Sequence, residues 1–587
     1  APGTPGRDGI GRRGAMLGQA GPQYTLGDRV NQLNWRSHQL TGGERIASEA
    51  FLAGLGLSQE QLGQAQVAIG VPWLHGNLCN THTPQLAEKM RAGCGEAGVV
   101  GMPFGLPGVS DAISMGHPGM RMSLVSRGLL ADAIEMVCEA HLYDAFVGVH
   151  ACDKNGPGAV MAMARMNIPS LLVSGGTILP GCHDGEEITI KNAFAAAGLH
   201  RVGRMDRSTR DTIVRKACPG PGGCGAMYTF NTMGCTFEAM GLTLPYSSSI
   251  PAVDPLKQRE CEQVGSAIRL LLEADIRPRQ LLTKAAFING IVTAAAIGGS
   301  TNVVLHLLAI AREAGVDLKI EDFQAIFRRT PVIANFAPRG PKSMVDLHRV
   351  GGTPALLKVL LAEGLIDGDI LTVTGRTLRE NLQSLPELSE GQDVVAVGGK
   401  FFKESADLQI VFGTLAPDSA VFKVPFEQTR WTGPARVFNG EADMVKAVAQ
   451  GDIKPGDIVI IRYVGPKGAP GMPEMLEPSS AISSVPELNG QVVLITDARY
   501  SGVSGGAIGG HVCPEAFEPG SPISLVENGD PIVLDLQAGL LDLDVAPDLL
   551  EKRKLSVVTP PDSAELPRIL STYRRSVGSA RYGCPVE

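Results

Sequence analysis

The run AFVGVHACDK (residues 145–154) decides the fold class of this chain. Its apolar part predicts a buried strand, which ends in a cysteine followed by two charged residues. An amphipathic helix is predicted before it at residues 129–137, and two more buried strands are predicted at 67–71 (VAIGV) and 170–174 (SLLVS). Strands that alternate with helices indicate βαβ units and a parallel sheet. The carboxyl ends of such strands are where open α/β sheets place their chemistry.

Two further cysteines stand where an apolar run gives way to Gly-rich and polar sequence. Cys79 lies in GNLCN (76–80), and Cys224 lies in PGPGGCGAM (219–227). With Cys152 they would supply three thiolates, whereas an iron–sulfur cluster takes four ligands. The missing ligand would leave one iron open to act as a Lewis acid on a substrate oxygen. This pattern indicates an enzyme.

Three acids stand in loops that follow predicted strands or apolar runs. Asp153 comes directly after the second of these cysteines, Asp111 lies in GVSD (108–111), and Glu474 lies in GPKGAPGMPEM (465–475). A strand-end acid such as Asp153 is either a surface residue or a member of a site, and the residues around it leave both interpretations open. An isolated acid in an apolar stretch, such as Asp111, is rarely buried unless it is paired or binds a metal. Together the three acids would form an oxygen-rich site suited to Mg²⁺.

A polar turn, TDARYSG (496–502), ends another predicted strand. Ser501 in this turn is either a helix N-cap, the commonest role of a serine after a strand, or a catalytic nucleophile or base. No G-x-S-x-G pattern surrounds it, which argues against serine hydrolase chemistry. The Gly-rich loop before Cys224 lacks the patterns of phosphate-binding loops, which argues against nucleotide binding.

The composition is that of a globular α/β protein. The chain has 587 residues, of which 44% are hydrophobic and 19% charged, and it combines 72 glycines with only 5% aromatic residues. Two or more domains are expected at this length. The net charge of −8, without a basic stripe, argues against nucleic acid as a partner. The eleven cysteines lack the spacing of a secreted disulfide framework, and eight of them are expected to be structural or incidental: Cys94, Cys138, Cys182, Cys218, Cys235, Cys261, Cys513 and Cys584.

Two segments bear on the location of the protein. Residues 285–311 contain no Asp, Glu, Lys or Arg, but polar residues interrupt them. Two buried helices joined by the turn GGSTN (298–302), with Ser or Thr as N-cap, explain this stretch better than a membrane span. A soluble protein without membrane contact is therefore expected.

Residues 1–35 form an N-terminal arm whose beginning is rich in Gly, Pro and Arg, which predicts the remnant of an organellar transit peptide or a disordered arm.

The character of the sequence changes after residue 385. Short β-rich runs separated by Gly/Pro turns follow, at 409–412, 420–424, 457–461 and 492–495. We therefore expect an N-terminal α/β domain with a parallel sheet at 36–385 and a C-terminal β-barrel-like domain flanked by helices at 386–587.

Seven motifs occur together and in a fixed order: GNxCN, GVSD, ACDK, PGxCGAMYTxNTM, GGSTN, GPxGxPGMPEM and TDxRxSG. This combination is highly specific, although each motif alone would be weak. From about residue 36 to its end, the chain resembles the dihydroxy-acid dehydratases of branched-chain amino acid synthesis. The wider group includes phosphogluconate and sugar-acid dehydratases.

Carried over residue by residue, the resemblance implies a [2Fe–2S] cluster held by Cys79, Cys152 and Cys224. It implies a Mg²⁺ site formed by Asp111, Asp153, Glu474 and an N-carboxylated Lys154. A free ammonium would repel the metal, whereas a carbamate adds an anionic oxygen ligand. Ser501 would be the catalytic base. The resemblance also implies a homodimer. With the arm as a transit remnant, the protein would lie in an organellar matrix, mitochondrial rather than plastid, and without one it would be cytoplasmic.

The implied reaction converts 2,3-dihydroxy-3-methylbutanoate and 2,3-dihydroxy-3-methylpentanoate to 2-oxo acids. Dehydration of a sugar acid is the alternative within the family. A non-catalytic iron–sulfur protein is a distant alternative, because it leaves the acids, Lys154 and Ser501 unexplained. Family members usually have TDGRFSG where this chain has Ala498 and Tyr500. These departures suggest a secondary hypothesis, a duplicated paralogue that tolerates an inhibitor of the housekeeping enzyme.

Overall fold

The computed structural model describes residues 35–41, 45–201, 203–556 and 565–587. The chain divides into two compact units, residues 1–64 and 65–587. In the first unit, a short 3-10 helix (Arg36–Leu40) precedes α1 (Ile46–Gly54) and α2 (Gln59–Leu62). Apart from residue 35, the predicted N-terminal arm lies outside the described residues.

The second unit begins with a four-stranded, fully parallel sheet in the order β2-β1-β3-β4. The sheet is the one that the apolar runs predict, since three of its strands cover residues 67–71, 145–149 and 170–174. Parallel strands need long crossover connections, which helices supply here. The strands are β1 (Gln66–Pro72), β2 (Val100–Leu106), β3 (Ala145–His150) and β4 (Ser170–Ser174).

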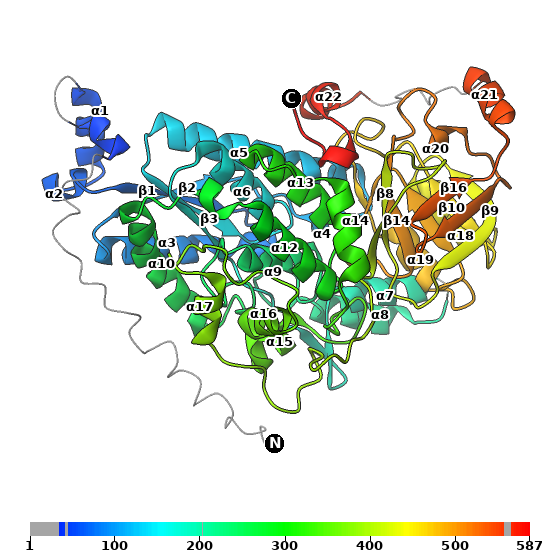
Figure 1. Cartoon of the computed structure of the whole chain (residues 1–587), viewed down its shortest axis with the longest axis horizontal. Helices are drawn as coiled ribbons and strands as arrows, with labels where there is room; N and C mark the ends of the chain where they lie inside the picture. Colours follow the sequence, from blue (N-terminus) through cyan, green and yellow to red (C-terminus); the bar gives the residue numbers. More distant parts are fainter. Residues whose placement is uncertain (1–34, 42–44, 202, 557–564) are drawn as a thin grey trace. The chain divides into compact units, whose positions relative to one another are not determined.

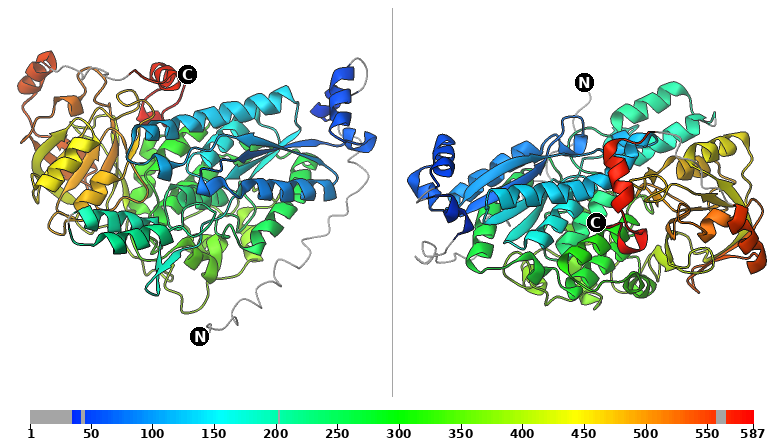
Figure 2. Two further views of the ribbon diagram at one scale, coloured as in Figure 1. Left: turned by 180° about the vertical axis from the view of Figure 1, so that it is seen from behind. Right: turned by 90° about the horizontal axis from the view of Figure 1, so that it is seen from above.

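Helices cover both faces of this sheet. Figures 1 and 2 show α5 (Arg121–Ala140) and α6 (Asn155–Met166) on one face and α3 (Thr83–Glu96) and α10 (Pro255–Glu273) on the other. The predicted helix at 129–137 lies within α5. With both faces covered, β1, β3 and β4 are buried throughout, which explains why they read as continuous apolar runs.

Further helices complete this part of the unit. The predicted pair of buried helices is confirmed as α12 (Lys284–Ala296) and α13 (Asn302–Ala314), joined at Gly298–Thr301. Thr301 is the N-cap of α13 by position, but the capping bond comes from Ser300, whose hydroxyl accepts from the N–H of Asn302. The remaining α-helices and strands of this part are α4 (Asp111–Ser114), β5 (Gly181–His183), β6 (Glu186–Ile188), α7 (Ile190–Arg201), α8 (Arg207–Lys216), α9 (Thr229–Ala239), α11 (Pro278–Leu281), α14 (Ile320–Arg329), α15 (Met344–Val350), α16 (Gly352–Ala362) and α17 (Leu378–Gln383).

The C-terminal part contains an eight-stranded mixed sheet in the order β16-β15-β9-β10-β12-β14-β8-β7. A bridge between Phe412, just beyond β7, and Leu540 in β16 joins its two outer strands and nearly closes it into a barrel. This confirms the predicted barrel-like fold. The strands are β7 (Leu408–Val411), β8 (Ser419–Lys423), β9 (Arg430–Phe438), β10 (Ile458–Ile461), β12 (Val493–Thr496), β14 (Ala507–Cys513), β15 (Pro531–Asp535) and β16 (Leu540–Leu543).

The side chains of β10 show how the barrel is packed. Ile458 and Ile460 belong to one core cluster with other strand residues, whereas Val459 and Ile461 belong to a second cluster that includes residues of α18 (Glu441–Gln450) and α19 (Glu477–Ser483). Successive strand residues point to opposite faces of a sheet. One face of β10 therefore packs within the barrel and the other against the flanking helices. Helices α20 (Pro522–Leu525), α21 (Pro547–Ser556) and α22 (Arg568–Ser576) lie nearer the C-terminus.

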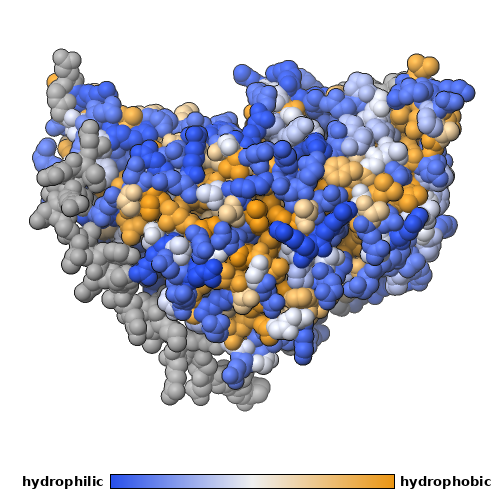
Figure 3. Space-filling model, in the orientation of Figure 1, coloured by the Kyte–Doolittle hydropathy of each residue, from blue (hydrophilic) through white to orange (hydrophobic). Residues whose placement is uncertain are grey.

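On the face drawn in Figure 3, polar residues predominate and apolar residues reach the surface in separate areas across its middle. Within the described ranges, no helix combines the length and apolarity that crossing a membrane requires. Both sheets lie in one compact unit. The predicted domain boundary near residue 385 stays a prediction.

Candidate active site

Two of the predicted cysteines meet at the carboxyl edge of the four-stranded sheet. A short 3-10 turn beyond β1, Leu78–Asn80, carries Cys79, and β3 leads almost directly into Cys152. The neighbouring Cys152 thiol, followed by burial, raises the pKa of Cys79. Neighbouring parallel strands thus bring together two residues that are 73 positions apart in the sequence.

The third cysteine reaches the same edge through a backbone connection beyond β4. Thr177 forms a β-bridge with Gly223, and the Thr177 hydroxyl donates to the carbonyl of Cys224 at 2.8 Å. Burial, followed by the charges of Asp153 and Cys152, raises the pKa of Cys224. The three thiols are therefore close neighbours. Soft thiolates gathered in this way are the ligands of an iron–sulfur cluster, so the residues fit that group. All eleven cysteines of the chain are free.

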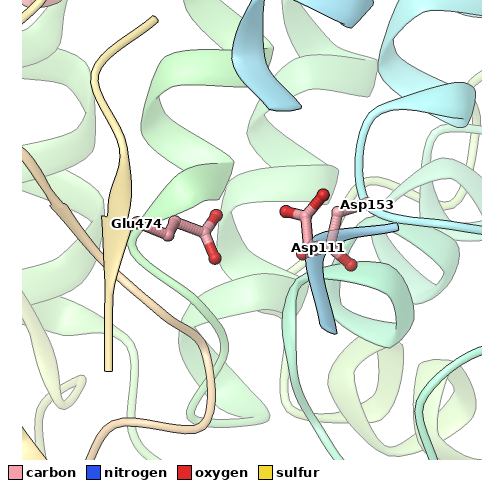
Figure 4. Close-up of side chains that lie close together, drawn as sticks. All are labelled: Asp111, Asp153 and Glu474. Carbon is pink, nitrogen blue, oxygen red and sulfur yellow. The ribbon is translucent and has the colours of Figure 1, made fainter. Parts of the chain in front are cut away.

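The three predicted acids also gather at one point. Asp111, Asp153 and Glu474 are buried, and each offers a carboxylate oxygen within 4.8 Å of the others. Figure 4 shows Glu474 extending from its strand toward the carboxylates of Asp111 and Asp153, which face it from the opposite side. The hydroxyl of Ser123 donates to Asp111 at 2.9 Å. Three hard oxygen donors at this spacing fit a divalent cation such as Mg²⁺.

The ammonium of Lys154 lies among these carboxylates. Its Nζ is 2.7 Å from Asp111 Oδ2, 3.2 Å from Glu474 Oε1 and 3.7 Å from Asp153 Oδ2. Burial works to lower the pKa of Lys154, but the three carboxylates outweigh it and raise that pKa. Burial raises the pKa of Asp153 to about 7, against the opposing effect of Lys154. A cation already occupies the position that the carboxylates surround.

A short parallel pair of strands joins Glu474 to Ser501. In this pair, β11 (Glu474–Met475) lies beside β13 (Arg499–Tyr500), with Glu474 opposite Arg499. The N–H of Ser501, the next residue, donates to the carbonyl of Met475 at 3.0 Å. No helix begins at Ser501, so the N-cap interpretation is wrong: turns follow it up to β14.

Glycines allow two close backbone approaches at the site. A Cβ on Gly502 would lie 2.9 Å from the N of Thr229, so the turn that carries Ser501 packs directly on the start of α9. Gly471 has φ +93°, and a Cβ there would lie 1.8 Å from the carbonyl oxygen of Arg121 at the start of α5. Only glycine fits that position without displacing the loop that leads to Glu474.

Comparison with protein families shows which family the chain belongs to. Residues 64–381 match the N-terminal domain, and residues 393–584 the C-terminal domain, of the dihydroxy-acid/6-phosphogluconate dehydratases. The chain belongs to this family. The resemblance drawn from the sequence motifs is thereby confirmed, and the chain is an enzyme of the hydro-lyase class.

Curated relatives span almost the whole chain of this dehydratase. A dihydroxy-acid dehydratase of Francisella tularensis subsp. novicida is 45% identical over 94% of this chain and 98% of its own. A relative from Aspergillus fumigatus, named as mitochondrial, is 47% identical over 92% of this chain and 91% of its own. One from Arabidopsis thaliana, named as chloroplastic, is 44% identical over 94% of this chain and 91% of its own.

Three long helices of the dehydratase begin at the site. They are α6 at Asn155, which follows Lys154, α9 at Thr229 and α13 at Asn302. The hydroxyls of Thr229 and Ser300 are 3.0 Å apart, which places the starts of α9 and α13 together. Helix N-termini carry partial positive charge, so they stabilise carboxylates and anionic substrates.

The two departures from the usual family motif face the protein core. Ala498 and Tyr500 both belong to the cluster that packs β10 and β12 against α18 and α19. The Tyr500 side chain is 1% exposed, and its hydroxyl has no hydrogen-bond partner among the described residues. These two substitutions change packing behind the site, and neither one bears on the predicted ligands.

Sequence reasoning assigned no role to three residues that contact the predicted ligands. Ser123 binds Asp111, and both Asn302 and Arg499 bind Glu474. Asn302 and Arg499 are members of the GGSTN and TDxRxSG motifs, which was a signal that they belong to the site. Nothing in the sequence marked Ser123.

Proposed function

We propose that this enzyme removes water from 2,3-dihydroxy-3-methylbutanoate and 2,3-dihydroxy-3-methylpentanoate, giving the 2-oxo acids of valine, isoleucine and leucine synthesis. Relatives named dihydroxy-acid dehydratase from a bacterium, fungi and a plant, at 44–47% identity, support this substrate class. The observation that carries the proposal is the meeting of three thiols and three carboxylates at one sheet edge.

The donor sets suggest the cofactors. Cys79, Cys152 and Cys224 would hold a [2Fe–2S] cluster, and Asp111, Asp153 and Glu474 would hold Mg²⁺. The ammonium of Lys154 and a divalent cation would compete for the same carboxylates, which lie 2.7–3.7 Å from Nζ. Conversion of Lys154 to a carbamate removes this competition and adds an anionic oxygen, so we include the carbamate in the proposal.

The reaction needs a base for the proton on C2 of the substrate and a route for the 3-hydroxyl to leave. When bound, Mg²⁺ would acidify that proton by holding the substrate carboxylate and 2-hydroxyl, and an open iron would act as a Lewis acid toward the 3-hydroxyl. Ser501 Oγ, ionised as the alkoxide, takes the C2 proton while the bond from C3 to its hydroxyl breaks. Ser501 then returns that proton to the departing hydroxide, which leaves as water and restores the alkoxide. The enol that remains tautomerises to the 2-oxo acid, which balances the reaction.

Ser501 is suited to this role by its surroundings. The residue is 7% exposed, and its turn packs on the N-terminus of α9. A hydroxyl is a poor base unless nearby positive charge lowers its pKa, and both the helix N-terminus and a bound cation supply such charge. Ser501→Ala is expected to abolish turnover while the cluster and metal still bind.

Ser504→Ala is the matched control, because Ser504 lies in the same turn, is 2% exposed and donates through its hydroxyl to the Met475 carbonyl. It should retain activity. Turnover by the Ser501 variant at the wild-type rate would remove the assigned role.

The substrate is tested by an anaerobic assay of reconstituted protein with Mg²⁺ and 2,3-dihydroxy-3-methylbutanoate, following 2-oxo acid formation. Product that requires both cluster and Mg²⁺ supports the assignment. The family also contains 6-phosphogluconate dehydratases, so aldonates are assayed in parallel. Product from an aldonate alone, with the cluster intact, would transfer the assignment to sugar acids. A loaded protein inactive on both would favour a non-catalytic role.

We also propose a homodimer in an organellar matrix, the mitochondrial matrix in first place. Large apolar side chains are exposed near the predicted ligands, among them Trp73 at 57%, Leu78 at 41% and Ile113 at 69%, and a second subunit would cover such side chains. Fungal relatives are named as mitochondrial. Light scattering of the purified protein tests the dimer, and expression of the full chain with a fluorescent tag tests the compartment.

A further inference from the structure

We propose that Asn302 and Arg499 are positioning residues that hold the Glu474 carboxylate in the orientation in which it faces the metal. The inference rests on the proposed metal site and adds what determines its geometry. Two donors at 2.6 Å, Asn302 Nδ2 and Arg499 Nη1, bind the same oxygen, Glu474 Oε1. Among the described residues, no hydrogen bond reaches Oε2.

The bonds converge on one oxygen of the carboxylate. The Lys154 ammonium also donates to Oε1, at the longer distance of 3.2 Å. Oε1 therefore accepts three hydrogen bonds, and the two short ones, from Asn302 and Arg499, fix the direction in which the carboxylate points. Figure 4 shows the Glu474 carboxylate directed at the two aspartates.

Other bonds hold the two donors in turn. Asn302 Oδ1 accepts from Arg499 Nη1 at 3.1 Å, which fixes the orientation of the amide, and Asn302 Nδ2 also donates to Thr229 Oγ1 at 3.0 Å. Arg499 Nε donates to the carbonyl of Met472 at 2.7 Å. Asn302 and Arg499 are both fully buried. The contacts therefore join the start of α13, the start of α9 and the strand pair β11–β13 around a single carboxylate oxygen.

A purely structural role would predict different behaviour. A buried amide that only satisfies a neighbour contributes stability, and its loss leaves metal affinity unchanged. A residue that orients a ligand changes the affinity itself, typically by about 10–100-fold. Asn302→Ala removes one of the two short bonds to Oε1 and lets the carboxylate rotate, so we expect Mn²⁺ to bind about 10–100-fold more weakly.

The experiment measures Mn²⁺ affinity by electron paramagnetic resonance on anaerobic, cluster-loaded protein, with the cluster checked by its absorption spectrum. Asn289→Ala is the matched control, because Asn289 is equally buried, lies on the adjoining α12 and makes two amide bonds to Asp367 at 2.7 and 2.8 Å. It should lose stability without losing Mn²⁺ affinity. Arg499→Lys is a second variant, which keeps the charge but cannot bond Met472, Asn302 and Glu474 together.

The outcomes separate this inference from the proposed function. Weaker Mn²⁺ binding by the Asn302 and Arg499 variants, with turnover recovering at high Mg²⁺, supports the positioning role. Wild-type affinity in the Asn302 variant overturns that role and leaves the metal site standing. Failure of the wild type to bind Mn²⁺, or binding unaffected by Glu474→Gln, overturns the metal site and the positioning role together.

Discussion

Replacing Lys154 by Met should destabilise the metal-free protein, and adding Mg²⁺ should then restore much of the lost stability. In the metal-free protein the Lys154 ammonium is the cation that the three buried carboxylates share. The side chain is 2% exposed, so water cannot compensate its loss. Met has a similar length and no charge. Among the described residues, the substitution leaves the three buried acids with one ion pair, that of Glu474 with Arg499.

The magnitude follows from the distances. At an effective dielectric constant of about 20, a separation of 2.7 Å to Asp111 gives an attraction of about 6 kcal/mol, and 3.2 Å to Glu474 gives about 5 kcal/mol. Most of this attraction offsets the cost of burying the charges. Removal of one partner from a buried ion pair costs about 3–5 kcal/mol, which is the loss expected here in the presence of EDTA.

Mg²⁺ should restore much of that loss, because it would replace the missing cation. A ligand at 100 times its Kd stabilises the folded state by about 2.7 kcal/mol. In the wild type, Mg²⁺ must first displace the ammonium or await its conversion to a carbamate, so the same addition should stabilise the wild type less than the variant.

Thermal or denaturant midpoints in EDTA and in Mg²⁺ measure both effects. Lys257→Met is the control, since Lys257 is fully buried and bonds Glu260 at 2.5 Å and the Ser247 carbonyl at 2.8 Å, and is not among the residues of the metal site. It should be destabilised equally in EDTA and in Mg²⁺. A Lys154 variant as stable as the wild type in EDTA, or one that Mg²⁺ stabilises no more than the control, would refute the reasoning.

Three other changes test particular parts of the structure. Gly471→Ala places a Cβ against the Arg121 carbonyl, at a residue whose φ is +93°. Metal affinity, measured by Mn²⁺ binding, and activity should both fall. Unchanged Mn²⁺ binding would mean that the loop does not position Glu474. Burial raises the pKa of Glu238 from 4.5 to about 7. Because the folded state then holds a proton that the unfolded state has lost, stability should fall by about 3 kcal/mol as the pH rises from about 4.5 to 7, and Glu238→Gln should flatten that slope in unfolding midpoints. Tyr500→Phe removes a buried hydroxyl that has no hydrogen-bond partner among the described residues, so the free energy of unfolding should rise by about 1–3 kcal/mol with activity retained. A loss of stability would indicate that the hydroxyl has a partner.

The sequence predicted the strands and the ligand candidates because both depend on short-range patterns. Apolar runs such as 145–149 are continuous where helices cover both faces of the sheet, so periodicity and length identified β3 without knowledge of its neighbours. The acids and cysteines could be placed at strand ends for the same reason. The parallel pairing of β1 with β3 then brings Cys79 close to Cys152.

Contacts that depend on distant segments could not be predicted in this way. Asn302 and Glu474 are 172 positions apart, and their contact depends on how α13 packs against the strand pair β11–β13. Likewise, the fold beyond β13 decided between the two interpretations of Ser501, since the residues that follow it form a turn that leads into β14 and no helix begins there. Closure of the barrel through Phe412 and Leu540 also joins residues far apart.

The order of residues at the end of β3 accounts for how two unlike centres could serve one small substrate. Cys152 offers a soft sulfur ligand, and Asp153, the next residue, offers a hard oxygen ligand. Consecutive Cα atoms are about 3.8 Å apart, so the cluster and the divalent cation that these side chains would hold must be close neighbours. A molecule that carries a carboxylate and hydroxyls on adjacent carbons is long enough to contact both. A sugar acid also carries a carboxylate and hydroxyls on adjacent carbons. The adjacent cysteine and aspartate therefore select the reaction, and the residues around the rest of the substrate must discriminate between a branched-chain acid and a sugar acid.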